Sequence, residues 1–400
     1  MYEIGQSEID AVTNVLRSGQ LFRYRGGEGG EVDTCEAKLR QMFDSHHALV
    51  VTSGTGALIA GLVGLGIGPG DEVLVPAYTW LASAGAILSV GAIPVLVEID
   101  ETLTLDTAEF ERMIGPQTKA VIPVHMGSRP SDMDAIMAIA QRHNLYVLED
   151  ACQAIGATYK GKALGAIGDA GTFSFNQFKA IACGEGGALL TNSRKIYERA
   201  LYYHDMGCTF RSHAGTLSEE PFLGNTLRMN ELLGAMLRVQ LDRLDDIMQR
   251  LRERQGWILD VVRAHDVPFA ISPSHDAAGD AGQYATFIFS DAKLREAVAT
   301  RAYELQPECS LGTPINSGLH VYTNWNVLLE QQGGFHPAIN PYLRPENSAC
   351  RKELTQASCP RTLDILARTA TLGINPKMTR EECEAVAATL CRAAREVTTP

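Results

Sequence analysis

The chain has 400 residues, more than one hydrophobic core comfortably fills, so two domains are the first expectation. Its formal net charge of -12, without a cluster of Lys and Arg, argues against a nucleic-acid partner. Hydrophobic residues make up 45% and charged residues 20%, which is ordinary for a soluble globular enzyme. Nine scattered cysteines with no CxxC pair argue against a disulfide framework and favour a reducing cytoplasm.

The N-terminal part of the chain indicates neither secretion nor membrane insertion. The first residues, MYEIGQSEIDAVTNVLRSG, lack the apolar core of a signal peptide. Residues 76–97 carry no charge and are long enough to span a bilayer. Because Gly91 and Pro94 interrupt this segment, we expect a buried helix followed by a strand.

Seven short apolar runs follow one another in the first half of the chain. They cover residues 47–53, 72–77, 93–99, 120–126, 145–151, 169–175 and 187–192. Most are apolar throughout, as expected for strands that are covered on both faces. Helical patterns such as TGALIAGLVGLG and SDMDAIMAIAQRHN lie between several of them. This alternation predicts an α/β fold with a mainly parallel seven-stranded sheet.

The pattern changes after residue 192. A long helical stretch runs from about 230 to 264, and a strand-like piece follows at 284–290. We therefore expect a large α/β domain over residues 1–250, including the N-terminal segment, and a smaller α+β domain over 251–400.

The stretch VVTSGTGAL, residues 50–58, has the context of an anion site. An apolar strand ends in Ser-Gly-Thr-Gly, and a helix begins at once. Backbone amides at such a helix start, with the hydroxyls of Ser53 and Thr55, suit a phosphate group. The alternative is a plain N-cap, because Ser and Thr are favoured there without any ligand. The later glycine-rich run GLGIGPG follows a helix and precedes a strand, which does not fit a dinucleotide loop.

A second strand, in LYVLEDACQAIG, ends in Glu149 and Asp150. A carboxylate at the end of a central strand is costly to bury without a partner, and ligands of α/β sheets bind at such ends. A magnesium ion and a cationic ring nitrogen are both possible partners. The histidines show no ligand spacing typical of zinc or iron, and we expect no metal site.

The third feature is Lys179, in GDAGTFSFNQFKAIACGEGG. Most lysines are solvated surface residues, but this one follows a buried strand and precedes a glycine-rich turn. A phosphate site, an acid and a lysine at three strand ends are what pyridoxal phosphate (PLP) requires. The phosphate needs amides, the pyridinium nitrogen needs a carboxylate, and the aldehyde needs an amine for a Schiff base.

Together these motifs, with PAYTW, GEGG and GNTLRMNELLGAM, resemble the DegT/StrS family of PLP-dependent sugar aminotransferases over roughly residues 15–245. The resemblance implies a type I aminotransferase fold and a homodimer with each active site at the subunit interface. It also implies a ping-pong transfer of an amino group from glutamate or glutamine to a keto- or aldehydo-sugar.

The resemblance assigns roles residue by residue. Lys179 is the Schiff-base lysine, Asp150 faces the pyridine nitrogen, Gln153 lies beside the ring, and Trp80 stacks on it. The phosphate contacts are Gly54, Thr55 and Ser174, with Asn225 reaching the phosphate from the partner subunit and Arg228 in the same motif.

The substrate is less well defined. VHMGSRPSDMDAI and HVYTNW look most like the branch that aminates 3-deoxy-octulosonate at its terminal carbon, while nucleotide-linked keto-sugars and cyclitol ketones stay open. The expected substrate-side residues are His320, Tyr322, Asn324 and Trp325, unless they belong to a loop that packs on itself. A PLP-dependent sugar dehydratase, in which histidine replaces the lysine, and a non-catalytic binding protein are the rival functions.

Overall fold

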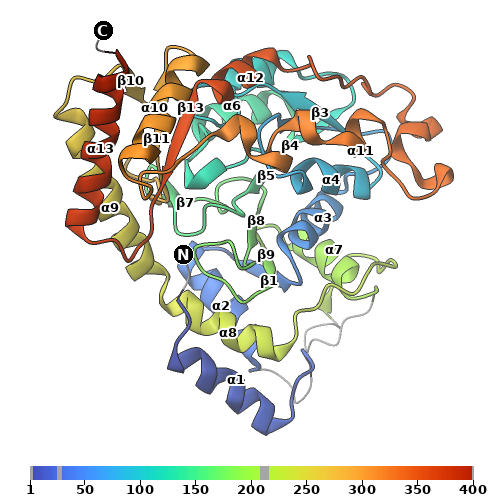
Figure 1. Cartoon of the computed structure of the whole chain (residues 1–400). Helices are drawn as coiled ribbons and strands as arrows, with labels where there is room; N and C mark the ends of the chain where they lie inside the picture. Colours follow the sequence, from blue (N-terminus) through green and yellow to red (C-terminus); the bar gives the residue numbers. More distant parts are fainter. Residues whose placement is uncertain (1–2, 25–28, 208–215, 399–400) are drawn as a thin grey trace.

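The computed structural model describes residues 3–24, 29–207 and 216–398 (Figure 1). Its centre is a seven-stranded sheet in the order β1-β9-β8-β5-β4-β2-β3. The strands are β1 (His47–Val51), β2 (Glu72–Pro76), β3 (Ile93–Val97), β4 (Thr118–Val121), β5 (Tyr146–Asp150), β8 (Ala170–Ser174) and β9 (Gly187–Thr191). β9 is antiparallel to both neighbours, whereas the pairs from β8 to β3 are parallel. The predicted α/β class and mainly parallel sheet are confirmed.

The strand expected at 120–126 is shorter than predicted, and β4 ends at Val121. Pro123 lies in the part of the expected strand that is not regular, and it has no N–H with which to continue the hydrogen-bond ladder. Beyond it, His125 N donates a hydrogen bond of 3.1 Å to the Asp150 carbonyl. The chain therefore stays beside β5 without forming a regular strand.

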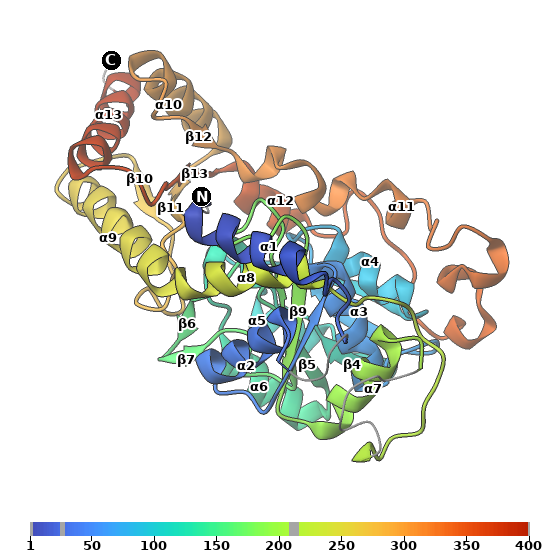
Figure 2. The same ribbon diagram turned by 90° about the horizontal axis from the view of Figure 1, so that it is seen from below.

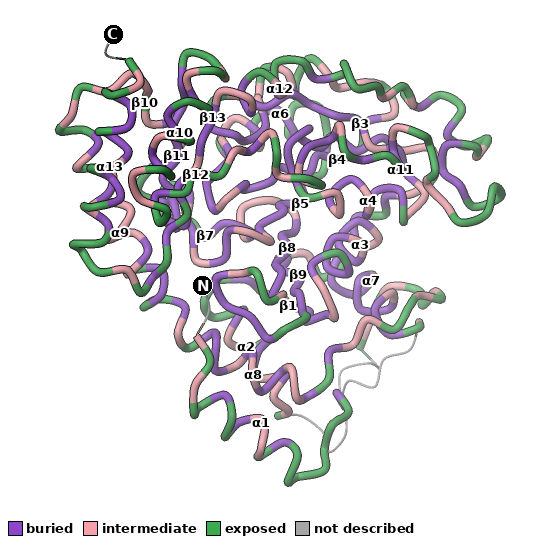
Figure 3. The backbone as a smooth tube through the Cα atoms, viewed as in Figure 1, coloured by how far each residue is buried: buried purple, intermediate pink, exposed green. Residues whose placement is uncertain are grey.

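Both faces of the large sheet are covered by helices, which explains why its strands are apolar throughout. Within β1, the adjacent residues Leu49 and Val50 belong to hydrophobic clusters on opposite faces. One face packs against α2 (Glu31–Phe43), α5 (Thr107–Arg112), α6 (Met133–His143) and α8 (Glu231–Asp242). The other packs against α3 (Gly54–Leu65), α4 (Ala82–Ser89) and α7 (Arg194–His204). Figure 3 shows the buried backbone concentrated in these central layers.

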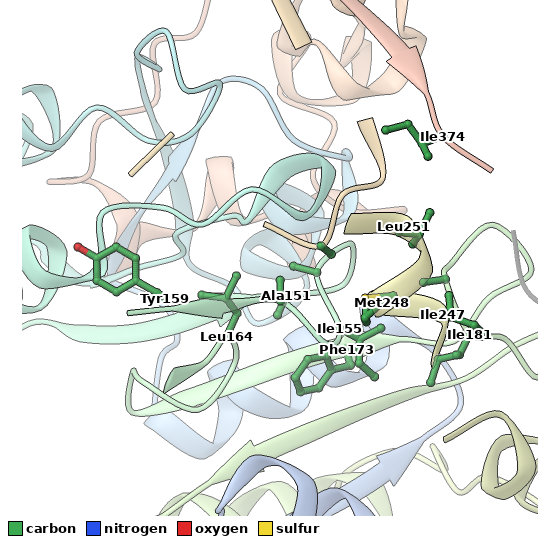
Figure 4. Packing of buried hydrophobic residues seen from close by; sticks show 14 of the residues in the cluster. Ala151, Ile155, Tyr159, Leu164, Phe173, Ile181, Ile247, Met248, Leu251 and Ile374 are labelled. Carbon is green, nitrogen blue, oxygen red and sulfur yellow. The ribbon is translucent and has the colours of Figure 1, made fainter. Parts of the chain in front are cut away.

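The loop after β5 packs against a compact group of buried hydrophobic side chains. Ile155 and Phe173 lie in one cluster with Met248 and Leu251 of α9 (Leu244–Arg263) (Figure 4). A short hairpin, β6 (Thr158–Tyr159) and β7 (Lys162–Ala163), follows the loop. This packing holds the residues immediately after Asp150 in place.

The helical stretch expected at 230–264 forms two helices, α8 and α9, which meet at Arg243. Figure 2 shows α8 beside α1 (Gln6–Ser18) and α9 leading from there to a second sheet. That sheet is antiparallel, with the order β10-β11-β13-β12. Its strands and remaining helices are β10 (Phe269–Ile271), β11 (Tyr284–Phe289), β12 (Leu311–Gly312), β13 (Thr369–Gly373), α10 (Ala292–Leu305) and α13 (Arg380–Thr398).

The division into domains near residue 250 stays a prediction, and α9 continues across that point. After β12 the chain returns to the large sheet, where Val321 and Trp325 join the cluster formed with α3 and α4. The returning elements are η3 (Pro314–Asn316), η4 (Gly318–His320), η5 (Tyr322–Asn324), α11 (Asn326–Leu329), η6 (Pro337–Ile339), η7 (Pro341–Leu343), η8 (Pro345–Asn347) and α12 (Pro360–Ala367).

The uncharged segment 76–97 forms the end of β2, then α4 and β3, which confirms the expected helix and strand. Among the helices that the structure describes, none combines the length and apolarity needed to cross a bilayer. Over the same residues there is no group of three or more His, Cys, Asp or Glu side chains arranged to hold a metal ion.

Candidate active site

A cavity of about 120 Å³ lies at the edge of the large sheet where β1, β5 and β8 end. Strands that run in the same direction bring their carboxyl ends to one edge, and this is where α/β sheets bind ligands. The cavity is lined by seven residues that the sequence singles out: Gly54, Thr55, Trp80, Asp150, Gln153, Ser174 and Lys179. The fold therefore joins side chains that lie far apart in sequence.

The end of the cavity that suits a phosphate group is formed by the N-terminus of α3. Ser53 is its N-cap, and its Oγ accepts a hydrogen bond of 3.0 Å from Gly56 N. This is the contact that the plain N-cap interpretation expects. The first-turn amides of Gly54 and Thr55 have no partner inside the helix, because no carbonyl precedes them at helical spacing. With the adjacent hydroxyls of Thr55 and Ser174, they form a donor set that suits a phosphate.

Gly54 is required by a close approach between α3 and the end of β8. A Cβ atom at residue 54 would lie 2.7 Å from Ser174 Cβ and 3.0 Å from Cys152 Sγ. Such distances do not occur between real side chains without displacement. The absence of a side chain thus brings the helix start and Ser174 together around one small space.

Asp150 is the acid of the cavity, and it is only 5% exposed. Its Oδ2 accepts a hydrogen bond of 2.7 Å from Ser83 Oγ, and its Oδ1 accepts one of 3.1 Å from Cys152 N. Since Thr79 Oγ1 lies 2.7 Å from Ser83 Oγ, a short chain of hydroxyls orients the carboxylate.

Glu149, the preceding residue, points away from this site. Its carboxylate accepts hydrogen bonds from three backbone amides, those of Gly165, Ile167 and Gly168. His125 Nε2 donates a fourth at 3.0 Å, while His125 Nδ1 accepts from Ser131 N. Glu149 is thus a fully satisfied buried acid that holds a loop, and Asp150 alone of this pair lines the cavity.

Lys179 lies in the loop between β8 and β9 and is half-buried. Its backbone N donates to Asn176 O at 3.0 Å, so a tight turn places the side chain at the cavity. The charge of Lys179 acts on the pKa of two neighbouring side chains, His320 and Cys152. Burial lowers the pKa of His320, and the Lys179 ammonium lowers it further. Burial also raises the pKa of the Cys152 thiol, while Lys179 acts in the opposite direction.

Trp80 and Gln153 line the other side of the cavity, and His320 contacts both of them without lining it. The Trp80 and His320 ring centroids are 5.1 Å apart at a tilt of 58°. His320 Nδ1 lies 3.1 Å from the Ser317 carbonyl, which can only accept, so the proton resides on Nδ1. His320 Nε2 then accepts from Gln153 Nε2 at 3.4 Å, and Gln153 Oε1 accepts from Gly127 N. His320 is a neutral imidazole beside the aromatic ring.

Two predicted residues lie outside the cavity of this single chain. Asn225 is exposed, and its Nδ2 donates to Tyr203 Oη at 2.9 Å. Arg228 forms an ion pair with buried Asp205 and stacks over the Phe22 ring at 5.2 Å. Their assigned roles toward a phosphate and a substrate stay predictions.

Three predicted substrate contacts also do not line the cavity. Tyr322 and Trp325 are fully buried in the cluster between the returning segment and the large sheet. Tyr322 Oη donates to Gln356 O at 2.8 Å, and Trp325 Nε1 donates to Leu319 O at 2.8 Å. Asn324 Nδ2 donates to Gly318 O. The bonds of Asn324 and Trp325 stay within their own loop, as the alternative interpretation expects, whereas Tyr322 bonds a more distant segment. The substrate roles of these three residues stay predictions.

Sequence reasoning missed Ser83 and Thr79, which control the acid. The signal was present, since Ser83 is a hydroxyl among the apolar residues of a helix whose other hydroxyl, Ser89, is its last residue, and it lies four residues after Thr79. A buried hydroxyl in such a run needs a partner. Only the fold shows that the partner is Asp150.

The sequence comparisons agree with this geometry. The profile of the DegT/DnrJ/EryC1/StrS aminotransferase family matches residues 2–306. The spore coat polysaccharide biosynthesis protein SpsC of Bacillus subtilis is 33% identical over 392 residues, 96% of this chain and 93% of that protein. GDP-perosamine synthase of Caulobacter vibrioides is 42% identical over 212 residues, 53% of this chain and 56% of that protein. An L-glutamine:2-deoxy-scyllo-inosose aminotransferase of Streptoalloteichus tenebrarius is 35% identical over 77% of this chain and 74% of its own.

A solved structure extends the match to the whole fold. The aminotransferase from Psychrobacter cryohalolentis is 27% identical, covers 99% of this chain and 97% of its own, and superposes with a TM-score of 0.80. Family profile, relatives and fold agree, and the resemblance drawn from the motifs is confirmed. This chain belongs to the DegT/DnrJ/EryC1/StrS aminotransferase family.

Proposed function

We propose that this aminotransferase moves an amino group from glutamate or glutamine to a keto- or aldehydo-sugar, with PLP bound covalently at Lys179. The observation that carries the proposal is that Lys179, Asp150 and the N-terminus of α3 line one cavity. The relatives named above support the sugar as acceptor. The 3-deoxy-octulosonate sugars, to which the motifs VHMGSRPSDMDAI and HVYTNW point, are one subset of such acceptors.

The residues of the cavity fit this cofactor at each of its polar groups. The amides of Gly54 and Thr55 and the hydroxyl of Ser174 suit the phosphate, and the absence of a Cβ atom at residue 54 lets Ser174 lie close to the helix start. Asp150, held as an acceptor by Ser83 and Cys152 N, suits a protonated ring nitrogen. Trp80 provides an aromatic face, and Gln153 lies beside it. When bound, PLP supplies an aldehyde for imine formation and an electron-withdrawing ring.

The chain's own groups then divide the work. Lys179 Nζ would hold the aldehyde between turnovers and, once displaced by the donor amine, would act as the base that takes the proton from the donor α-carbon. Asp150 would accept a hydrogen bond from the ring nitrogen at the opposite end of the site. Neutral His320 contributes shape and a hydrogen-bond acceptor without adding a positive charge beside the lysine.

We also propose a homodimer, with Asn225 reaching the phosphate of the partner subunit. Large apolar side chains are exposed near the cavity and near Asn225, which supports a covering partner. Phe178, next to Lys179, is 77% exposed, and Leu223 is 79% exposed. All eight cysteines in the described part of the chain are free thiols, which supports a reducing location such as the cytoplasm.

A cyclitol ketone is the second candidate acceptor, because one relative of 35% identity is named for such a reaction. A sugar dehydratase is less well supported, since Lys179 is present where that chemistry uses histidine. A non-catalytic protein would not need the lysine, the acid and the anion site together.

The test follows the two half-reactions. The holoprotein is titrated with glutamate and with glutamine while the cofactor absorption band is recorded, and the aminated form is then offered a panel of keto-sugars and cyclitol ketones. We expect the band to change with a donor and to return with an acceptor. A band that no amino donor changes would overturn the proposal. Borohydride reduction followed by peptide mapping should label Lys179.

A further inference from the structure

A second and larger cavity, of about 440 Å³, adjoins the first: Gln153 lines both, and His320, which lines the larger one, contacts Gln153 and Trp80. It lies between the large sheet and the small one, with walls from the 126–129 loop, β11 and the η3–η4 segment. Its lining combines apolar side chains, such as Leu103, Met126 and Leu311, with neutral hydrogen-bonding ones: Thr286, Thr313, Asn316, Ser317 and Thr371. A largely apolar wall with several hydroxyl and amide groups suits a polyhydroxylated ligand, whose orientation those groups fix.

One charged residue, Arg129, belongs to this wall and is only 6% exposed. Its Nη2 donates to the carbonyls of Ser272 and Pro273, and its Nε has no hydrogen-bond partner. Nη1 donates to no residue in the described part of the chain. The guanidinium is therefore buried with unused hydrogen-bonding capacity at the border of an open space.

The charge of Arg129 is also incompletely compensated. Asp280 and Asp100 are close enough to act on it, but neither forms an ion pair with it within the described residues. Burial lowers the pKa of the guanidinium, which shows that the site disfavours an unpaired cation. A buried cation is stabilised when an anion is placed against it. The cavity is an open space that borders the guanidinium, so an anion bound there can reach it.

We propose that the larger cavity binds the acceptor sugar, and that Arg129 binds a carboxylate carried by that sugar. This inference rests on the proposed function and narrows it to acidic sugars. A single cation with neutral surroundings matches the single charge of a carboxylate better than the double charge of a phosphate. The volume of this cavity, with hydroxyl and amide groups set among apolar side chains, matches a sugar acid better than the small amino donor.

The alternative is that Arg129 only braces the turn at 272–273. Arg252 offers a matched control, because its guanidinium also donates to two carbonyls, those of Asp280 and Gly156, both at 2.9 Å. Arg252 is half-buried and does not line the cavity. Arg129→Gln and Arg252→Gln therefore separate a cavity-facing role from a bracing role.

The experiment uses D-glucuronate and D-glucose as probes, because they differ by a carboxylate in place of a hydroxymethyl group. Binding of each to the wild-type holoenzyme is measured by calorimetry, and the glutamate half-reaction is measured separately in every variant. We expect wild type to bind glucuronate at least about ten-fold more tightly than glucose, in line with one charged hydrogen bond. Arg129→Gln should lose this preference, and Arg252→Gln should keep it.

The remaining outcomes count against the inference. Equal or undetectable binding of the two probes to wild type overturns it without any variant. A preference that survives in Arg129→Gln overturns it as well. If Arg129→Gln slows the glutamate half-reaction instead, the anion belongs to the donor, and the acceptor proposal is wrong. If no amino donor converts the cofactor of the holoenzyme to its aminated form, the proposed function is wrong. The preference for glucuronate can still be measured in that case, because the calorimetric experiment depends only on binding.

Discussion

Ser83 Oγ lies 2.7 Å from Asp150 Oδ2 and donates its proton to that carboxylate. Because the single hydroxyl proton of Ser83 is used in this way, Thr79 Oγ1 must donate to Ser83 Oγ across the other 2.7 Å contact. The hydroxyl of Thr79 thus donates to that of Ser83, which in turn donates to the buried Asp150 carboxylate. These hydroxyls keep the Asp150 carboxylate oriented as an acceptor, which is the role that a protonated ring nitrogen requires.

Replacing Ser83 by Ala should lower kcat/KM without unfolding the protein. Loss of a hydrogen bond to a charged group is worth roughly 1.5–3 kcal/mol, or about ten- to a hundred-fold in rate if it acts on the reacting state. Ser89→Ala is the matched control, because Ser89 is an exposed hydroxyl of the same helix that bonds only Gly85 O. Equal kinetics of the two variants would show that Ser83 does not support Asp150.

Lys179→Ala should abolish transamination, with a loss of at least about 1,000-fold in turnover, because no other amine lines the cavity among the described residues. The cofactor absorption band should shift, since the covalent link to the chain is lost. Lys160→Ala, which removes an exposed lysine paired with Asp134, should have wild-type activity. Steady-state assays with the same donor and acceptor check both variants. Appreciable turnover by Lys179→Ala contradicts the assigned role.

Gly54→Ala should weaken cofactor binding and destabilise the fold. The added methyl group would lie 2.7 Å from Ser174 Cβ, and overpacking of this kind costs about 1–3 kcal/mol. Gly85→Ala is the control, because a Cβ atom there meets nothing within 4 Å, and alanine in a helix is favoured by about 0.5–1 kcal/mol over glycine. Thermal unfolding with and without PLP compares the two. A Gly54→Ala protein that gains as much from PLP as wild type would refute the close-approach argument.

Glu8 should make the attachment of α1 sensitive to acid. Burial raises the pKa of Glu8, but hydrogen bonds from Arg243, Gly5 N and Gln240 outweigh it and lower the pKa to about 2. Between pH 4.5 and about 2 the unfolded chain therefore binds a proton that the folded chain does not. The stabilisation is present above pH 4.5 and is lost as the pH falls through this window.

Urea unfolding of wild type and Glu8→Gln across this range measures the effect. Wild type should be the more stable at neutral pH, and the difference should shrink as the pH approaches 2. Glu296→Gln, which changes an exposed carboxylate of α10, should leave the pH dependence of wild type unaltered. A constant gap between wild type and Glu8→Gln at all pH values would contradict the role of the ionised Glu8.

Much of the site follows from the sequence because its main residues stand at the ends of apolar runs. Six of those runs end at the same edge of the sheet, so Gly54, Asp150, Ser174 and Lys179 were predictable as neighbours from the strand pattern and the motifs. Ser53 is a different case. It is an N-cap in the structure, and its residue type alone could not separate capping from anion binding.

Tertiary structure decided which polar groups face the ligand. Glu149 and Asp150 are adjacent acids, and only the fold assigns one to a backbone loop and the other to the cavity. His320 lies beside the cavity, in contact with Gln153, whereas Tyr322 and Trp325, close by in sequence, are buried in the core. The meeting of Arg129 with Thr371 around one cavity depends on how the small sheet packs. Local patterns determine strands, helix starts and turns because those depend on near neighbours in the chain. Which side chains share a pocket depends on packing between distant segments, and no local pattern encodes it.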